Sequence, residues 1–168
     1  MHIQITKALP EDAEGLIEFL NTVGAETDNL SFGAEGFGIS VENERKYLER
    51  MIDSQTSVMF VARIDGKIVG NASFSAVPRD RMKHRGSFAV AVVKSAWGQG
   101  IGSRLLEAVI NFAKDTAHAE IISLEVRSDN TRAIKLYEKY GFTKIGHFNG
   151  FFKINGEYID CDLMNLYL

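Results

Sequence analysis

The chain has 168 residues, with 19 Lys and Arg against 22 Asp and Glu, and a formal net charge of −3. This length suits one domain with its own core, and 45% hydrophobic with 24% charged residues is typical of a globular protein. The acidic balance and the lack of a Lys/Arg cluster disfavour a nucleic-acid binder, and no apolar stretch reaches membrane-spanning length.

Cysteine and histidine usage argues against cross-links and metal chemistry. Cys161 is the only cysteine, so no internal disulfide is expected, and its alternation with Ile159 and Leu163 in an expected strand favours a buried thiol. The four histidines are scattered without ligand spacing, so no metal site is expected. The first residues lack a basic region followed by a long apolar run, which predicts no signal peptide and a cytoplasmic location.

The first half of the chain predicts a strand, two helices and a hairpin. The expected elements are a strand at His2–Thr6, a helix from Pro10 to about Val23, a loop at Gly24–Ile39, a helix capped by Ser40, and strands at Ser57–Ile64 and Lys67–Ala76. The residues of the second helix expected to face inward are Val41, Leu48, Met51 and Ile52. Asp65-Gly66 between the two strands is a strong signal for a tight hairpin. A polar, basic loop at Val77–Arg85 then leads to a strand that begins at Gly86.

A glycine-rich turn follows that strand and precedes an amphipathic helix expected at Ile101–Thr116. Gly98, Gly100 and Gly102 leave the backbone bare where the chain passes from strand to helix. Several N–H groups of a bare turn point outward together, and the N-terminus of the helix adds the positive end of its dipole. The turn therefore predicts a site for the phosphate or pyrophosphate of an anionic cofactor.

Two other phosphate-binding motifs do not fit this turn. A dinucleotide fingerprint needs a third glycine where Leu105 stands. A nucleotide triphosphate loop closes with Gly-Lys-Ser/Thr, whereas this chain has Gly102-Ser103-Arg104.

The second half of the chain continues the alternation of strands and helices. The expected elements are a strand at Ile121–Arg127, a helix within Asn130–Phe142, a strand at Phe142–Phe148, turns at Asn149-Gly150 and Asn155-Gly156, and a last strand through Leu168. The resulting order, β-α-α-β-β-β-α-β-α-β-β, predicts a mixed α/β sheet.

Two segments resemble the GNAT superfamily of acyl-CoA-dependent N-acyltransferases. Gly100 and Gly102 fall on the small positions of its pattern (Arg/Gln)-x-x-Gly-x-(Gly/Ala), while Trp97 stands where the family has Arg or Gln. The family segment Asn-x-x-Ala-x-x-x-Tyr-x-x-x-Gly-Phe is matched downstream by Asn130, Ala133, Tyr137, Gly141 and Phe142. The two motifs occur in the family's order and cover about a third of the chain.

The resemblance implies one GNAT-like domain over residues 1–168. Its fold would be α/β: a mixed, mostly antiparallel sheet flanked by helices, with splayed fourth and fifth strands. Its activity would be direct acetyl transfer, in a ternary complex, from acetyl-CoA to a primary amine of a small molecule or a peptide or protein. No metal is implied.

The same resemblance assigns the residues that bind acetyl-CoA. The pyrophosphate would lie on Gly98, Gln99, Gly100, Ile101, Gly102 and Ser103, and the pantetheine arm on Val90, Ala91 and Val92. A backbone N–H near Val92 would polarise the thioester carbonyl. Asn130 would cap a helix, bind the pantetheine amides, or do both.

Tyr137 is the expected general acid for the leaving thiolate, although most helix tyrosines only pack against a sheet. It lies two helical turns from Asn130 and so on the same face. Glu125, a strand carboxylate flanked by Leu124 and Val126, is the favoured general base. The other carboxylates weighed as bases or acceptor contacts are Glu26, Asp28 and Asp160, and His84 or a water chain could also serve as base.

Two alternative functions remain open at this point. A non-catalytic acyl-CoA sensor or interaction module would keep the glycine turn and lose the chemistry, which the presence of Tyr137 disfavours. A phosphate-binding nucleotide hydrolase is disfavoured by the missing lysine. The long C-terminal strand offers an edge on which a second copy could pair, so a homodimer is predicted.

Overall fold

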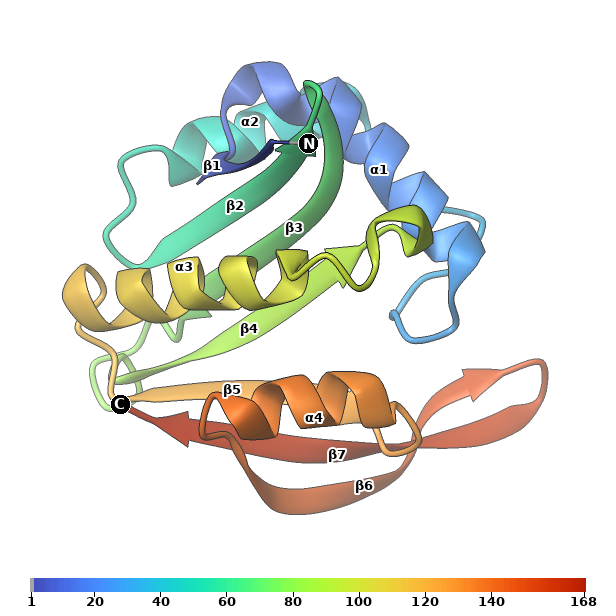
Figure 1. Cartoon of the computed structure of the whole chain (residues 1–168). Helices are drawn as coiled ribbons and strands as arrows, with labels where there is room; N and C mark the ends of the chain where they lie inside the picture. The colour runs from blue at the N-terminus through green and yellow to red at the C-terminus, as the bar shows by residue number, and fades with distance from the viewer. Residues whose placement is uncertain (1) are drawn as a thin grey trace.

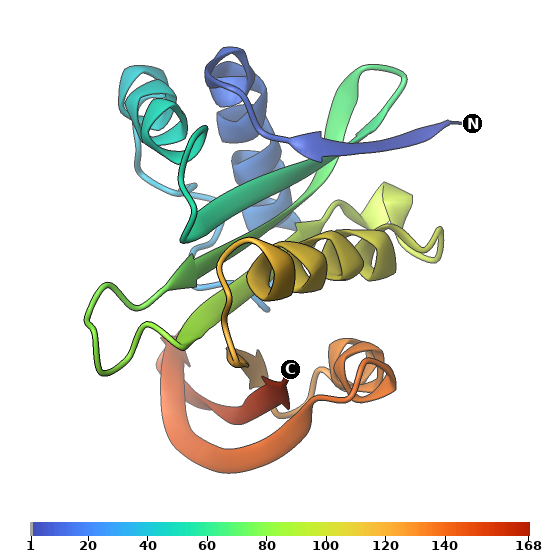
Figure 2. The same cartoon turned by 90° about the vertical axis from the view of Figure 1, so that its left-hand side faces the viewer.

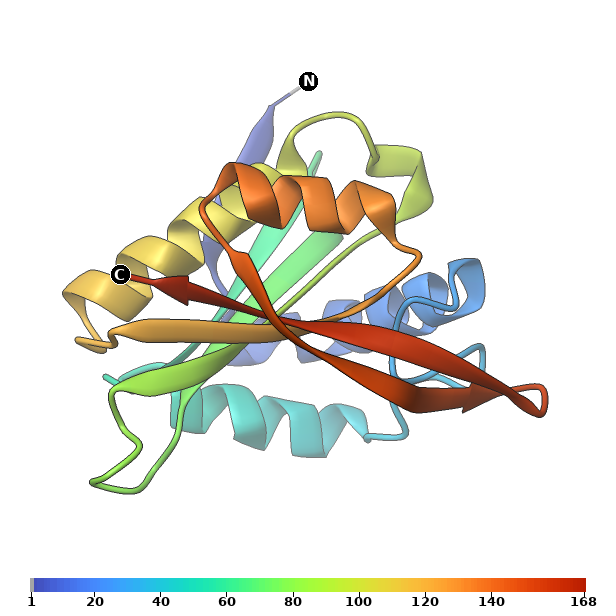
Figure 3. The same ribbon diagram turned by 90° about the horizontal axis from the view of Figure 1, so that it is seen from below.

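A computed structural model describes residues 2–168 and gives the order of elements that the sequence predicts (Figure 1). The elements are β1 (Ile3–Lys7), α1 (Ala13–Glu26), α2 (Val41–Met51), β2 (Ser57–Ile64), β3 (Lys67–Ala76), β4 (Arg85–Val92), α3 (Ile101–Asp115), β5 (Ile121–Arg127), α4 (Thr131–Lys139), β6 (Thr143–Ile154) and β7 (Glu157–Tyr167). The strands form one seven-stranded sheet in the order β1-β2-β3-β4-β5-β7-β6. Helices α1 and α2 cover one face, and α3 and α4 cover the other (Figure 3).

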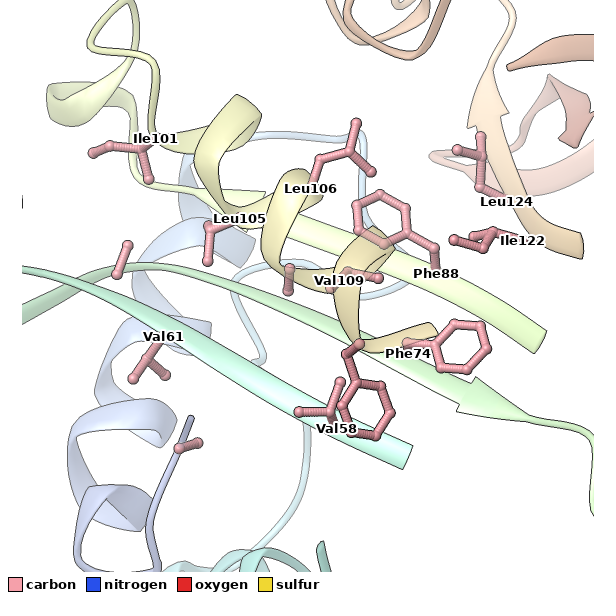
Figure 4. Packing of buried hydrophobic residues seen from close by; sticks show 14 of the residues in the cluster. Val58, Val61, Phe74, Phe88, Ile101, Leu105, Leu106, Val109, Ile122 and Leu124 are labelled. Atoms are coloured by element: carbon pink, nitrogen blue, oxygen red, sulfur yellow. The ribbon is translucent and has the colours of Figure 1, made fainter. Parts of the chain in front are cut away.

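The core of the α3 face is an apolar layer between α3 and the central strands. Leu105, Leu106 and Val109 form the inner stripe of α3 and are fully buried (Figure 4). Fully burying each such side chain contributes roughly 1.5–3 kcal/mol. Phe74 of β3 packs edge-on against Phe112 of α3, with ring centroids 6.4 Å apart.

The sheet opens between β4 and β5, the parallel pair at its centre. The two strands pair only at Arg85–Ile121, Gly86–Ile122 and Ser87–Ser123, and diverge beyond that point (Figure 1). Gly86 of β4 also leaves room for Phe74 of β3, since a Cβ at Gly86 would lie 2.4 Å from the Phe74 ring. The expected mixed sheet with splayed fourth and fifth strands is therefore confirmed.

The predicted turn at Asn149-Gly150 is wrong. Strand β6 continues without a break through these residues. It curves strongly (Figure 2), and its pairing with β7 shifts register between Phe148 and Phe152. Gly150 takes a positive φ of 68°, and its N–H donates to Asp160 Oδ1 at 2.8 Å. Pairing with β7 continues on both sides, so the local turn signal produces a bulge. The second turn, Asn155-Gly156, joins β6 to β7 as expected.

Helix α2 also differs from expectation in the face that it buries. Ser40 caps it by accepting a hydrogen bond from Asn43 N–H at 3.2 Å, as predicted. Ile52, expected to face inward, follows the end of the helix and is 40% exposed. Glu44 takes an inward position instead, together with Leu48, one turn further along.

Two further findings bear on function. None of the described helices is both long and apolar enough to cross a membrane. Within residues 2–168, no three His, Cys, Asp or Glu side chains are grouped so as to hold a metal ion.

Candidate active site

A cavity of about 870 Å³ lies where β4 and β5 diverge, and residues from both faces of the sheet line it. On the α3 and α4 face it is bounded by the glycine turn and the start of α4. On the opposite face it is bounded by the loop after α1, by α2 and by the β6–β7 hairpin. We call the first part the cofactor half and the second part the acceptor half.

The cofactor half begins with a backbone cradle for an anion. Gly98 and Gly100 have positive φ angles of 78° and 75°, and the space beside each is open. Gly100 is the N-cap of α3 and makes no side-chain cap. Among residues 2–168, no acceptor is bonded to the N–H groups from Gly98 to Ser103. Unsatisfied N–H groups at a helix N-terminus suit a pyrophosphate, so the cradle fits acetyl-CoA.

Trp97 joins this cradle to β4 and to α4. Its indole Nε1–H donates to the Val92 carbonyl at 2.7 Å. The Arg132 guanidinium, in the first turn of α4, stacks on the indole with its carbon 4.5 Å from the ring centroid. Arg132, held on the Trp97 ring, thus places a cation at the edge of the cradle.

The free edge of β4 faces the gap in the sheet. Antiparallel ladders alternate between bonded and non-bonded residue pairs. The Val93 N–H donates to the Val69 carbonyl at 3.0 Å, which places the bonds to β3 at odd-numbered residues of β4. The N–H groups of Val90 and Val92 consequently point away from β3, toward the diverging β5.

Tyr137 and Asn130 reach the cavity from α4. Asn130 caps this helix by accepting a hydrogen bond from Ala133 N–H at 3.2 Å. Tyr137 is 7% exposed and lies between Phe88 and Phe142, with ring centroids 6.1 Å and 5.7 Å away. Burial raises the pKa of its phenol to about 12, so the phenol stays protonated at neutral pH. Its hydroxyl has no partner among the described side chains and backbone groups.

The acceptor half is built from side chains. Its aromatic and apolar lining comes from the loop after α1, from α2, from β2 and from the hairpin, and includes Phe32, Phe37, Tyr47, Met59, Phe151 and Phe152. Two carboxylates line it as well, Glu44 of α2 and Glu125 of β5. Glu44 is 3% exposed, and burial raises its pKa.

A polar cluster holds the hairpin that carries Phe151 and Phe152. His147 bridges two carboxylates, with Nδ1 2.8 Å from Asp162 Oδ1 and Nε2 3.2 Å from Asp160 Oδ2. Lys144 Nζ lies 2.9 Å from Asp162 Oδ1, and the Ser128 hydroxyl donates to the same oxygen at 2.8 Å. The His147, Ser128 and Lys144 hydrogen bonds lower the pKa of Asp162 to about 2, and the two carboxylates raise the pKa of His147.

Comparison with known proteins identifies the chain. Residues 27–142 match the profile of the Acetyltransferase (GNAT) family. The chain belongs to this family. Like the rest of the family, it transfers an acetyl group from acetyl-CoA to an amine, and the predicted fold and activity are thereby confirmed.

Three relatives of this GNAT protein illustrate the match. The L-amino acid N-acetyltransferase AaaT of Escherichia coli K12 is 32% identical over 122 residues, which are 73% of this chain and 75% of that one. The crystal structure of a GNAT acetyltransferase from Streptococcus pneumoniae has a TM-score of 0.96 and 32% identity, and covers 99% of this chain and 100% of that one. YncA of Salmonella typhimurium, a putative acetyltransferase solved with its cofactor acetyl-CoA, shares the fold with a TM-score of 0.86 and 21% identity, over 100% and 95% of the two chains.

The cavity brings together most residues that the sequence singled out for this GNAT site. Its lining includes Val90, Ala91, Val92, Gly98, Gly100, Ile101, Gly102, Ser103, Glu125, Asn130 and Tyr137. Gln99 lies beside it, and its Nε2 donates to the Ser95 carbonyl at 3.3 Å.

The remaining predicted residues lie outside the lining. Glu26 ends α1, and its carboxylate accepts from Lys94 N–H at 2.8 Å. Asp28 accepts from Arg127 through its carbonyl at 3.2 Å. Asp160 belongs to the hairpin cluster, and the carbonyl of His84, just before β4, accepts from Glu120 N–H.

The sequence reasoning missed Glu44. The feature of the sequence that could have revealed it is a charged residue one helical turn before Leu48, on the face of the helix that Leu48 buries. The helical pattern alone does not say that this face looks into the gap of a splayed sheet.

Proposed function

We propose that the chain, acting as one domain, acetylates a primary amine of a small molecule or of a peptide or protein by direct attack in a ternary complex. The supporting observation is the cavity that reaches both faces of the sheet through the β4–β5 gap. Both substrates could occupy it at once, one on each face. Direct attack in such a ternary complex needs no covalent acyl-enzyme.

On the cofactor side, the N–H groups from Gly98 to Ser103 would hold the pyrophosphate and Arg132 would add a positive charge. The free edge of β4 would pair with the pantetheine arm as an added strand, and Asn130 would bind its amides. Acetyl-CoA supplies an acetyl thioester. A Val92 N–H aimed at the thioester oxygen would stabilise the charge that develops there by about 3 kcal/mol.

Proton transfer would involve Tyr137 and Glu125. Because its phenol stays protonated, Tyr137 can donate to the sulfur that leaves, a step worth roughly 10²–10⁴ in rate. Glu125 alternates with the buried Leu124 and Val126, so its carboxylate lies on the acceptor face of β5. We assign it the role of general base for the attacking amine.

The decisive experiment measures steady-state release of free CoA from acetyl-CoA against a panel of amines. Amine-dependent release that follows saturation kinetics in both substrates supports the proposal. If CoA binds tightly but no amine in the panel causes release, the proposed acceptor class is rejected.

The homodimer and the cytoplasmic location stay predictions. For the dimer, β6 is an edge strand of the sheet, and the hairpin exposes 49% of Phe148 and 71% of Tyr158. A monomeric mass by light scattering at micromolar concentration would reject the dimer. Cell fractionation tests the location.

A further inference from the structure

Glu44 carries an unpartnered carboxylate on the wall of the cavity. Only 3% of the residue is exposed, and it lines the cavity from the inner face of α2. Neither a hydrogen bond nor an ion pair reaches its side chain from the described residues, although α2 is rich in basic groups. Lys46, the neighbouring cation, pairs with Glu42 at 3.0 Å on the exposed face of α2.

An ionised carboxylate in such a place is costly. Partial removal from water raises the pKa of Glu44 and disfavours its ionised form, unless a cation or hydrogen-bond donors compensate. The apo protein therefore carries an unsatisfied preference for a positive group at this position. Because Glu44 lines the cavity, a ligand can supply that group.

The rest of the acceptor half specifies the ligand further. Its other walls combine aromatic side chains with aliphatic and small polar ones, and aromatic faces attract both apolar groups and cations. Arg132 is the one cation in the lining of the whole cavity, as far as residues 2–168 are concerned, and it stacks on Trp97 in the cofactor half. The second ionisable acid of the acceptor half, Glu125, adds more negative charge.

We propose that Glu44 anchors the ammonium group of the acceptor, and that the acceptor is an apolar primary amine without a carboxylate beside the amine. This inference rests on the proposed acetyl transfer. A free amino acid would bring its carboxylate toward Glu44 and Glu125 with no cation to receive it. Repulsion between like charges would discriminate against such a ligand. The preference would thus differ from that named for the relative AaaT, an L-amino acid acetyltransferase.

The first test compares three amines that share a benzyl group: 2-phenylethylamine, L-phenylalaninamide and L-phenylalanine. The two amines without a carboxylate should exceed the free amino acid at least tenfold in kcat/KM. Equal or better use of L-phenylalanine would overturn the assignment of the acceptor class.

The second test removes the charge of Glu44 while keeping its shape. Glu44→Gln should raise the KM for 2-phenylethylamine about tenfold and leave CoA affinity unchanged. The matched control is Glu42→Gln, on the same helix but exposed to solvent, which should change neither quantity. An unchanged KM in Glu44→Gln would overturn the proposal.

Thermal unfolding separates this role from a structural one. Removal of an unpaired buried charge should raise the Tm of the ligand-free protein, whereas loss of a structural contact would lower it. If Glu44→Gln does not fold, Glu44→Asp provides the second variant, with the charge retained and withdrawn from the chamber. It should weaken amine binding without altering CoA affinity, and unchanged amine binding would contradict the proposal.

Direct binding keeps the two proposals distinguishable. Calorimetry of 2-phenylethylamine with the CoA-saturated protein reports the acceptor site without turnover. Binding that depends on Glu44, with no CoA release from acetyl-CoA, would reject the proposed transfer and keep the site. Turnover that does not depend on Glu44 would support the proposed transfer and reject the Glu44 site.

Discussion

The two halves of the cavity are built from different parts of the chain. The cofactor half consists mainly of backbone: the free N–H groups of the glycine turn and the unpaired edge of β4. The acceptor half consists of side chains from α2, the loop after α1, the hairpin and strands β2 and β5. Backbone geometry tolerates changes in most side chains, so one cofactor site suits many proteins of a family. An acceptor site made of side chains is free to differ in each of them.

The largest effect is expected where the two halves meet, at Tyr137. Tyr137→Phe keeps the ring between Phe88 and Phe142 and removes only the donor. We expect kcat to fall about 100-fold, most clearly at high pH, where water is a poorer proton donor. CoA affinity and Tm should stay near wild type.

Tyr140→Phe is the control for this variant. Tyr140 lies at the end of the same helix, and its hydroxyl bonds Glu107 outside the cavity. It should keep full turnover. A Tyr137→Phe enzyme that also keeps full kcat across pH would remove Tyr137 from the catalytic residues.

The second prediction tests whether the cofactor half depends on bare backbone. Gly100→Glu places a side chain and a negative charge where phosphate oxygens would lie. CoA affinity, measured by calorimetry, should fall at least tenfold, a loss of about 1.4 kcal/mol or more. Gly156→Glu is the matched control, because Gly156 also has a positive φ and open space but lies in the β6–β7 turn. Equal CoA affinity in the two variants would reject the cradle.

The third prediction concerns the support of the acceptor half. Asp162→Asn should lower Tm by about 2–6 °C, because the His147, Lys144 and Ser128 contacts lose a charged acceptor. It should raise the KM of the amine and leave CoA affinity unchanged, since Phe151 and Phe152 lie on the same hairpin. Weaker CoA binding with an unchanged KM for the amine would contradict the assignment of the hairpin to the acceptor half.

The difference in Tm between wild type and Asp162→Asn depends on pH through two pKa shifts of opposite sign. Asp162 has a lowered pKa, about 2 against 3.8, so its contribution is present above pH 4 and is lost as pH falls toward 2. His147 has a raised pKa, so its contribution is complete below pH 6.5 and is lost as pH rises through the raised value. The Tm gap between wild type and Asp162→Asn should be widest between these limits.

The smallest effect is expected for Arg132. Arg132→Leu should weaken CoA binding about threefold at low salt, and the loss should shrink at 1 M salt because the Debye length falls to about 3 Å. Lys135→Leu, one turn along on the exposed side of α4, is the control. A loss in both variants would mean that the net charge of the helix matters, rather than the cation held on Trp97.

The sequence predicts the fold well where local chemistry and pairing agree. Alternation and Asp65-Gly66 place β2 and β3 at their observed bounds. Agreement fails at Asn149-Gly150, where pairing with β7 and the Asp160 carboxylate override a strong turn signal. It fails also at Ile52, because the pattern does not show where α2 ends.

The site, like the fold, has one part that local sequence predicts and another that depends on distant segments. The glycine turn is local in sequence, so its residues identify it without any knowledge of the fold. Glu44 and Phe151 line the same cavity only because α2 and the β6–β7 hairpin, distant in the chain, reach the same gap. No spacing of residues encodes that arrangement.

The three residue pairs that join β4 to β5 leave an incomplete seam in the sheet. A ligand that pairs with the free edge of β4 adds hydrogen bonds to the native state that the unfolded chain cannot make. At a concentration 100 times its Kd, such a ligand stabilises the native state by about 2.7 kcal/mol. The resistance of this protein to heat and proteolysis is therefore coupled to the supply of acetyl-CoA.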